Sequence, residues 1–238
     1  MGSISIRKSI RWLPDDASEP TSTIVLTSPQ RKFVDLRIFG PPPQREIPLG
    51  HIAPTQLDWG IAGTSSSSQR QEGEEGGETI TRGKWDHWID SRTTEAVSDE
   101  GDMFPLDDTT TLEKGRMVNP DTGLETDYEE VWDDVTPGVI PGVENGVRCV
   151  VLQMEDGPSR GMMVVLGRYC QAIARTDKGV SVERRIYQDR VGWNYHARLD
   201  GAWELPCDEV LSRLKLGQLP IGAAVEGAGR RWEVVEVA

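Results

Sequence analysis

Cysteine is scarce in the 238-residue chain, and its three copies, Cys149, Cys170 and Cys207, are widely spaced and confined to the second half. An odd, scattered set matches neither a disulfide framework nor a zinc site, and it indicates a reducing compartment. No apolar run approaches the length of a membrane span, and the first residues lack the apolar core of a signal peptide. We therefore expect a cytoplasmic protein without a membrane span.

Histidine and the common catalytic motifs are also sparse or missing. His51, His87 and His196 show no HxH or HxxxH spacing, which argues against a zinc or iron site. The sequence contains no phosphate-binding loop, dinucleotide fingerprint or GxSxG motif. These absences disfavour nucleotide hydrolysis, dinucleotide redox chemistry and serine hydrolysis, and we expect neither a metal nor a cofactor.

Acidic residues outnumber basic residues only in the first half of the chain. Residues up to Pro137 include 26 acidic and 13 basic side chains, whereas those from Gly138 onward include 13 of each, so the formal net charge of −13 arises before Gly138. An acidic surface repels phosphate groups, which excludes nucleic acid and anionic membranes as expected partners. The acidic surface does not exclude a basic partner, although a surplus of acidic residues also keeps a protein soluble.

Short runs of alternating apolar and polar residues fill most of the chain, and 25 glycines and 15 prolines separate them. Only Cys207–Leu216 has a helical pattern. The expected strands are Ser3–Leu13, Thr23–Ser28, Phe33–Phe39, Leu57–Gly63, Ile80–Ser91, two runs within Leu112–Asp134, Arg148–Met154, Gly161–Ala174, Val180–Tyr187, Gly192–Leu199 and Arg231–Val237. We predict an all-β protein of two calycin-like antiparallel barrels, with one short helix in the second.

A change in composition suggests where the barrels divide. Thr136–Gly146 contains two prolines and three glycines and coincides with the change in charge, so the predicted domains are residues 1–137 and 138–238. Thr64–Thr79 is rich in Ser, Gly and Glu with no apolar residue, which predicts a mobile loop in the first domain. Arg92–Asp108 also has the composition of an acidic loop.

The strongest indication of a site lies in Leu112–Asp134, two strand-like runs joined by Asn119–Gly123. A period of two places Tyr128, Glu130 and Trp132 on one face, and their size indicates that this face is inward. A carboxylate there needs a partner or a raised pKa, and Arg92 and Arg116 are the candidate partners of Glu130.

Other charged and aromatic residues complete the candidate set. Asp35 and Arg37 share a strand face, as an ion pair requires, opposite the apolar face of the same run. Glu113 lies on the strand paired with that of Glu130, but counting outward from the turn does not place the two carboxylates opposite each other. The candidate ligand-binding residues are Trp59, His87, Trp88, Arg92, Arg116, Tyr128, Glu130 and Trp132.

His87 can be a general base or a structural histidine. Alternation puts Asp86 and Asp90 on the face opposite to His87, so neither carboxylate is expected to orient it, and the structural role is the commoner one.

Several long runs resemble the fungal casein-kinase-interacting protein family described first in budding yeast. The runs are SEPTSTIVLTSPQRKFVDLRIF, LDWGIAGTSS, WDHWIDSR, DEGDM, LEKGRMVNPDTGLETDYEEVWDD and RGMMVVLGRYCQAIAR. The resemblance covers nearly the whole chain and implies a lipocalin-like protein with an N-terminal and a C-terminal barrel. That family has no agreed catalytic residues, so the resemblance assigns no role to any position.

Three functions follow from this fold. A barrel can bind a hydrophobic small molecule or dock a protein partner. It can also be a cofactor-independent isomerase or cyclase of the fungal-metabolite type, in which Glu130, Tyr128, His87 or Arg92 moves protons or stabilises charge. A filled barrel would instead indicate a structural role, so a cavity of about 300 Å³ or more with converging polar groups is the discriminating feature.

Overall fold

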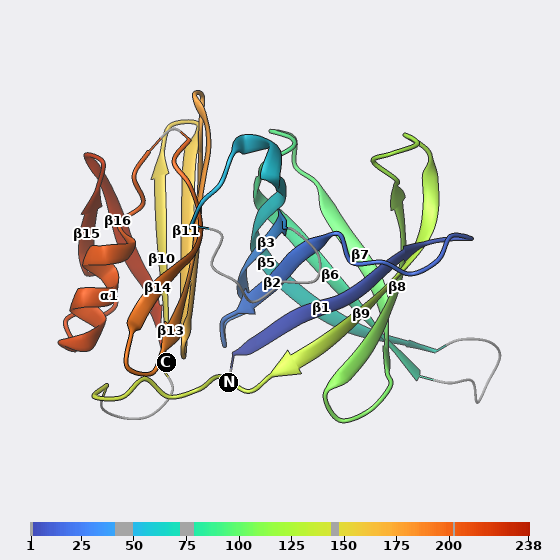
Figure 1. Cartoon of the computed structure of the whole chain (residues 1–238), viewed down its shortest axis with the longest axis horizontal. Helices are drawn as coiled ribbons and strands as arrows, with labels where there is room; N and C mark the ends of the chain where they lie inside the picture. Colours follow the sequence, from blue (N-terminus) through green and yellow to red (C-terminus); the bar gives the residue numbers. More distant parts are fainter. Residues whose placement is uncertain (1, 41–49, 72–78, 144–147, 202) are drawn as a thin grey trace.

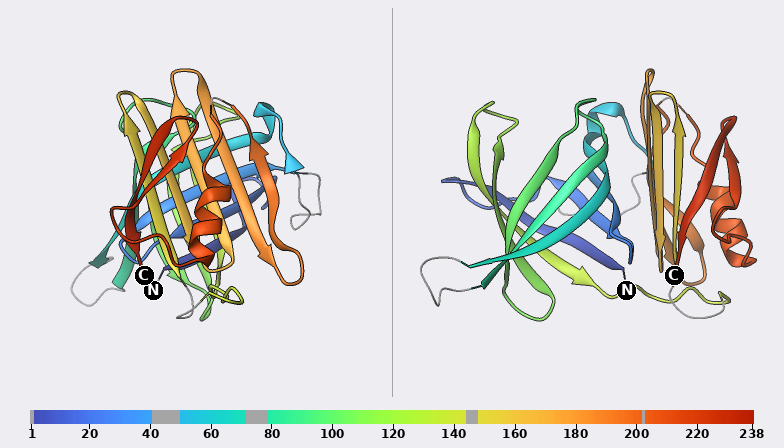
Figure 2. Two further views of the ribbon diagram at one scale, coloured as in Figure 1. Left: turned by 90° about the vertical axis from the view of Figure 1, so that its left-hand side faces the viewer. Right: turned by 180° about the vertical axis from the view of Figure 1, so that it is seen from behind.

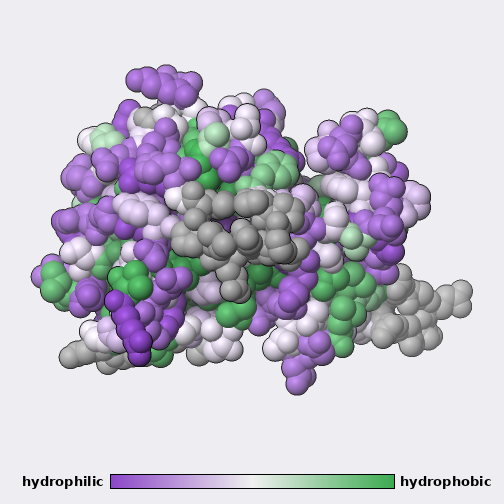
Figure 3. All heavy atoms as spheres, viewed as in Figure 1, coloured by the Kyte–Doolittle hydropathy of each residue, from purple (hydrophilic) through white to green (hydrophobic). Residues whose placement is uncertain are grey.

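The computed structural model describes residues 2–40, 50–71, 79–143, 148–201 and 203–238, and its strands form two sheets that pack against each other (Figure 1). The prediction of a mostly β protein with one short helix is confirmed over these residues. The face seen in Figure 3 is mostly hydrophilic, with hydrophobic residues scattered over it. No helix among the described residues has the length and apolar character needed to cross a bilayer.

The first sheet is a closed antiparallel barrel. Its strands, in order around the barrel, are β1 (Ser3–Trp12), β2 (Thr21–Thr27), β3 (Lys32–Phe39), β5 (Leu57–Gln71), β6 (Thr79–Asp90), β7 (Ser98–Pro105), β8 (Thr110–Val118) and β9 (Glu125–Val135). β9 closes the barrel by pairing with β1, from Ile4 opposite Val135 to Trp12 opposite Tyr128. Closure leaves every strand with one face toward the interior and one toward the outside.

The second sheet is open, so the predicted second barrel is wrong. Its strand order is β15 (Ala224–Gly227), β16 (Arg230–Val237), β10 (Cys149–Asp156), β11 (Ser159–Leu166), β12 (Tyr169–Thr176), β13 (Gly179–Gln188), β14 (Gly192–Leu199) and β4 (Gly50–His51). Helix α1 (Cys207–Lys215) and the short 3₁₀ turn η1 (Pro54–Gln56) are the described helical elements.

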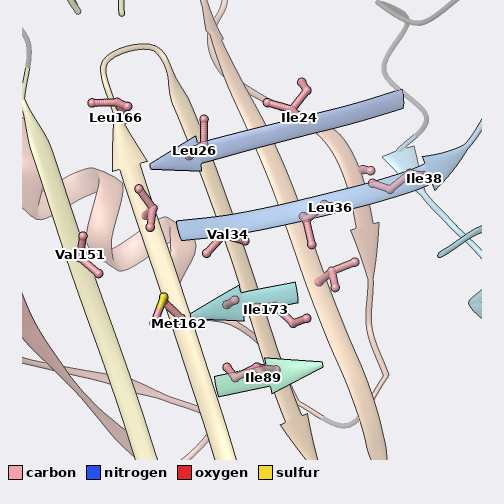
Figure 4. Close-up of a cluster of buried hydrophobic side chains, with 14 of the residues drawn as sticks. Ile24, Leu26, Val34, Leu36, Ile38, Ile89, Val151, Met162, Leu166 and Ile173 are labelled. Carbon is pink, nitrogen blue, oxygen red and sulfur yellow. The ribbon is translucent and has the colours of Figure 1, made fainter. Parts of the chain in front are cut away.

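Both faces of the open sheet are covered by other parts of the chain. Along β11, Met162 and Val164 pack toward the outer wall of the barrel, whereas Met163 and Val165 pack toward α1 and the β15–β16 hairpin. Figure 2 shows the same layers from two sides, and Figure 4 shows side chains of β2 and β3 meeting the second sheet. Strands buried on both faces are continuously apolar, as the run Met162–Leu166 is.

A buried polar seam joins the two sheets. Gln171 Nε2 donates to the backbone oxygens of Ile24 and Val34, each at 2.9 Å, and the Arg184 guanidinium donates to the Leu36 oxygen at 2.6 Å. The Nε of Arg184 also donates to Gln171 Oε1 at 2.6 Å. Both polar side chains are fully buried, so these bonds require the barrel and the sheet to dock in one register.

Three local predictions need correction. Thr64–Gln71 is not a loop but the second half of β5, paired with β6, while residues 72–78 of the predicted mobile loop lie outside the described residues. The predicted acidic loop Arg92–Asp108 contains strand β7. The predicted strand Gly161–Ala174 is two strands, because Gly167, with a φ of +52°, forms a turn between β11 and β12.

The proposed domain boundary lies between β9 and β10, the last strand of the barrel and the first of β10–β16. The short strand β4, which precedes β5 in the chain, nevertheless belongs to the second sheet, where Gly50 pairs with Ala197 in parallel. Residues of both sheets also share one hydrophobic cluster. The division into domains 1–137 and 138–238 therefore stays a prediction.

Candidate functional site

The barrel contains a cavity of about 400 Å³ lined by the inward side chains of its strands. Side chains at one end of the cavity are buried and mainly charged or aromatic: Asp35, Glu113, Tyr128, Glu130 and Trp132. Those at the other end are mostly small, polar and at least partly exposed: Ser3, Ser5, Arg31, Ser65, Ser66 and Ser67. This gradient of exposure indicates a pocket that opens to solvent at the serine-rich end.

Strand β9 supplies the wall that the sequence predicts to be inward. Tyr128, Glu130 and Trp132 are 3%, 3% and 8% exposed, and all three line the cavity. The intervening Glu129 points outward, where it pairs with Lys114 at 3.2 Å. The period of two therefore holds along this part of the strand.

Glu113 lies directly opposite Glu130 in the β8–β9 register. The expectation that the two carboxylates do not coincide is wrong, because Asn119 pairs with Leu124 and shortens the turn between the strands. This register, in which Val118 faces Glu125, brings both carboxylates to the cavity. Glu113 is 5% exposed, so the pair is buried.

The hydrogen-bond partners of Glu113 are neutral. Tyr128 Oη donates to Oε1 at 2.8 Å, and Trp132 Nε1 donates to Oε2 at 3.0 Å. Burial raises the pKa of Glu113, and the neighbouring negative charge of Glu130 raises it further, to about 8. At neutral pH the Glu113 carboxyl therefore holds a proton.

The partners of Glu130 are two guanidinium groups from strands that are far from β9 in the sequence. Arg7 of β1 and Arg37 of β3 both donate to Glu130 Oε1, Arg37 at 3.2 Å. The predicted partners Arg92 and Arg116 are wrong. Both lie outside the cavity, where Arg92 pairs with Asp58 at 2.6 Å and Arg116 pairs with Asp127 at 3.1 Å.

Asp35 and Arg37 form the ion pair expected from their shared face, with Arg37 Nε 3.0 Å from Asp35 Oδ2. The other oxygen, Asp35 Oδ1, is buried and accepts no hydrogen bond from any residue in the described part of the chain. Burial raises the pKa of Asp35, and the Arg37 charge acts in the opposite direction. One buried acceptor at the closed end of the cavity is thus left unsatisfied.

His87 also lines the cavity. Asp90 lies on the same face as His87, whereas strict alternation predicts the opposite face. A bulge in β6 makes Ala62 pair with Ile89 but Gly63 pair with His87, so Trp88 is an extra residue and Asp90 returns to the face of His87. Asp90 Oδ2 lies 2.9 Å from His87 Nδ1.

Asp99 of β7 flanks the other nitrogen of this ring. Its Oδ2 lies 3.2 Å from His87 Nε2, although the two atoms are not aligned as a hydrogen bond. Burial lowers the pKa of His87, but Asp90 and Asp99 outweigh it and raise the value to about 9. His87 is therefore a cation between two carboxylates at neutral pH.

The remaining tryptophans of the candidate set lie behind or outside the wall. Trp59 packs edge-on against His87, with ring centroids 5.8 Å apart, and donates to Asp90 Oδ1 at 3.0 Å. Trp88 packs against the hydrophobic cluster between the sheets, with Arg160 over its ring at 5.6 Å. Neither lines the cavity, so four of the eight predicted residues do, namely His87, Tyr128, Glu130 and Trp132.

Three glycines on adjacent strands make room for these side chains. Gly83, Gly101 and Gly115 are paired across β6, β7 and β8. A Cβ added to Gly101 would lie 2.6 Å from Glu113 Oε1, and one added to Gly115 would lie 2.3 Å from Tyr128 Oη. This glycine row therefore lets Glu113 and Tyr128 lie flat against the wall.

Sequence reasoning missed Arg7, Glu19 and Asp99. Arg7, which also binds Glu19 at 3.0 Å, belongs to the polar face of β1 with Ser5, and a polar face is ordinarily taken as the solvent side. In this barrel the polar face is the inner one. Within the described ranges no three His, Cys, Asp or Glu side chains are grouped as a metal site.

Comparisons with known proteins agree with the fold. The family model described as Protein HRI1 matches residues 3–236. The chain is similar to the crystal structure of an uncharacterized protein from Saccharomyces cerevisiae, with a TM-score of 0.71, 19% identity and coverage of 100% of this chain and 99% of that one. No curated protein matches the chain. Neither description mentions a kinase, so the casein-kinase association stays a prediction.

Proposed function

The chain belongs to the Protein HRI1 family, and we propose that its closed barrel is a binding module for a small molecule. The observation that carries the proposal is the 400 Å³ cavity with buried carboxyl groups converging at one end. Ligand pockets have volumes of about 300 Å³ or more and a few placed polar groups, whereas a structural barrel is filled by its own side chains.

The lining favours an amphipathic ligand over a wholly hydrophobic one. Phe33, Trp85 and Trp132 offer aromatic surface, whereas Asp35 and Glu113 offer carboxyl oxygens in the same space. A purely apolar ligand would leave the buried Asp35 Oδ1 without a donor, so the free-energy cost of that unsatisfied acceptor would persist. A molecule with an apolar body and a polar group satisfies both kinds of surface.

Filling the cavity tests the proposal. Val25, a half-buried lining residue, is replaced by tryptophan, and the same substitution at the exposed Val191, in the turn between β13 and β14, is the control. Ligand-observed NMR with a library of small molecules balanced in charge should find compounds that bind the parent and Val191→Trp but not Val25→Trp. A library without binders, or binders that Val25→Trp retains, would contradict cavity binding.

A second candidate is a cofactor-independent isomerase or cyclase. Glu113, with a pKa of about 8, faces a Glu130 carboxylate held by two guanidinium groups. A protonated and an ionised carboxyl in one pocket are a general acid and a general base. Time-resolved NMR of each binder with the parent should then show conversion to an isomer, which Glu113→Gln abolishes even at ligand concentrations that saturate the variant. If no binder is converted, the isomerase or cyclase proposal is wrong and only the binding function is supported.

A protein partner is a separate proposal carried by charge. The surplus of acidic residues lies in the part of the chain that builds the barrel, which suits a basic partner. The three scattered cysteines also support a proposed cytoplasmic location, because they do not form a disulfide framework.

A further inference from the structure

We infer that the cavity recognises a small organic cation bearing an N–H donor, an ammonium or guanidinium group, which Asp35 Oδ1 and the Glu113 carboxylate hold at the buried end of the barrel. The inference rests on the proposed function, since it names the chemical class of the ligand of that cavity.

Negative charge is in surplus around the cavity. Besides the protonated Glu113, its lining contains four carboxyl side chains, Asp35, Asp99, Glu130 and Asp134, against three basic ones, Arg31, Arg37 and His87. Of the basic groups, Arg37 is already paired with Asp35 and Glu130, and His87 is paired with Asp90 and Asp99. Arg31 is exposed at the open end. At the buried end an anionic ligand would have to displace the carboxylates of Asp35 and Glu130 from Arg37, whereas a cation meets the unsatisfied oxygen of Asp35.

Asp35 Oδ1 supplies a specific acceptor. Asp35 is 4% exposed and lines the cavity, and its buried Oδ1 receives no hydrogen bond from any described residue. An unsatisfied buried carboxylate oxygen costs free energy that a donor from the ligand would recover. The second oxygen is fixed by Arg37 at 3.0 Å, so the free one has a defined direction.

Glu113 supplies the second acceptor. Because Tyr128 and Trp132 are neutral donors, no basic side chain bonds directly to this carboxyl among the described contacts. Its pKa of about 8 means that a cation beside it would favour the ionised form and release a proton. Anions have the opposite effect on the same group.

The aromatic part of the lining suits the same ligand class. Phe33, Trp85 and Trp132 lie in the cavity with the two carboxyl groups. Aromatic faces attract ammonium and guanidinium groups and also bury the apolar part of the molecule. A neutral molecule gains only the second of these interactions.

Matched probes of different charge test the inference on the full chain. Indole, phenyl and octyl compounds, each as an amine, an alcohol and a carboxylate, are titrated calorimetrically: tryptamine, tryptophol and indole-3-acetate represent the first scaffold. We expect the amine of at least one scaffold to bind tenfold or more tightly than its alcohol, with the carboxylate weakest. Alcohols or carboxylates that bind as tightly as the amines would overturn the inference and leave the proposed function intact.

Variants assign the effect to the two carboxyl groups. Asp35→Asn and Glu113→Gln should reduce amine affinity to the level of the alcohol, while Asp127→Asn, an exposed carboxylate on β9, should leave it unchanged. Circular dichroism checks that each variant folds. If Asp35→Asn does not fold, the relative affinities of the amine, alcohol and carboxylate for the parent protein test the inference. Amines that bind both variants like the parent would overturn the inference.

Failure of the proposed function gives a different result. If none of the nine probes binds and the charge-balanced library also yields no ligand excluded by Val25→Trp, both proposals fall. If the library yields only neutral or anionic cavity ligands, the inferred cation class alone is wrong.

Discussion

Glu113 links the architecture of the barrel to proton uptake. Its pKa is about 8 in the folded protein against an ordinary value of 4.5, so between these pH values the folded chain holds a proton that the unfolded chain releases. Stability from this group is complete below pH 4.5 and declines as the pH rises toward 8. His87, raised from 6.5 to about 9, acts in the same direction at higher pH.

Replacing Glu113 should therefore flatten the pH dependence of stability. We expect the free energy of unfolding of Glu113→Gln, measured by urea denaturation at pH 5, 6.5 and 8, to fall less with rising pH than that of the parent. The charged groups around this carboxyl, Glu130 and Arg37, are unchanged in the variant. Glu125→Gln, at the exposed start of β9, is the control and should retain the parental slope. A parental slope in Glu113→Gln would show that its carboxyl is not protonated in the fold.

Inward-facing residues were predictable where the residue pattern of a single strand determines which face is buried. Tyr128, Glu130 and Trp132 follow the period of two, and Asp35 with Arg37 was recognisable as a pair on one face. The partners of Glu130 were not, because Arg7 lies 123 positions away in the chain and meets it only through barrel closure.

At the level of strands, the glycine row explains how the barrel keeps an open interior. The paired Gly83, Gly101 and Gly115 present no side chain to the cavity, so larger neighbours fold over them without filling its centre. Glycine in strands commonly marks such close approach.

Gly115→Ala should disturb this arrangement. The new Cβ would lie 2.3 Å from Tyr128 Oη, so the ring must move and its hydrogen bond to Glu113 is lost. We expect a cost of about 1 to 3 kcal/mol in unfolding free energy, typical of overpacking, with a changed near-ultraviolet circular dichroism signal. Lys114→Ala, at the adjacent outward position, is the control. It should cost less than about 1 kcal/mol, because a surface ion pair contributes no more than that to stability. Equal effects in the two variants would contradict the proposed role of the glycine.

Strand boundaries were predictable from composition except where pairing overrides it. Thr64–Gln71 has no apolar residue but gains a partner strand, because β6 supplies the backbone hydrogen bonds. The bulge at Trp88 was likewise hidden, since one extra residue reverses which face Asp90 occupies and no single-strand pattern reports it.

Over the whole molecule, the barrel and the open sheet depend on one shared hydrophobic cluster. Leu36 of the barrel and Ile173 of the sheet are both fully buried in it. Packing of this kind couples the stability of the two sheets.

Ile173→Ala should therefore loosen the barrel as well as its own sheet. A cavity left at a buried isoleucine costs about 2 to 5 kcal/mol, and hydrogen exchange of amides in β2 and β3 should accelerate accordingly. Ile221→Ala, at a position that is 66% exposed, is the matched control and should leave the exchange rates unchanged. Barrel amides that exchange at the parental rate in Ile173→Ala would instead support two independent domains.

The open second sheet could not be predicted from the alternation of apolar and polar residues. Runs such as Met162–Leu166 have the length of a barrel strand, but they are apolar on both faces, which is the mark of a covered sheet and not of a barrel with one solvated face. Closure also depends on which strands pair last, and that information is spread over the whole chain.

Strand β4 has a consequence for the order of events on the ribosome. Its partner residues Ala197 and Arg198 are synthesised almost 150 positions after Gly50 and His51, so the edge of the second sheet waits for nearly the entire chain. Until then the apolar outer faces of β2 and β3 have no cover, because the sheet that buries them is made from later residues. Long delays before non-local pairing expose nascent chains to aggregation. The early barrel strands are therefore the part of this protein most in need of chaperone protection during translation.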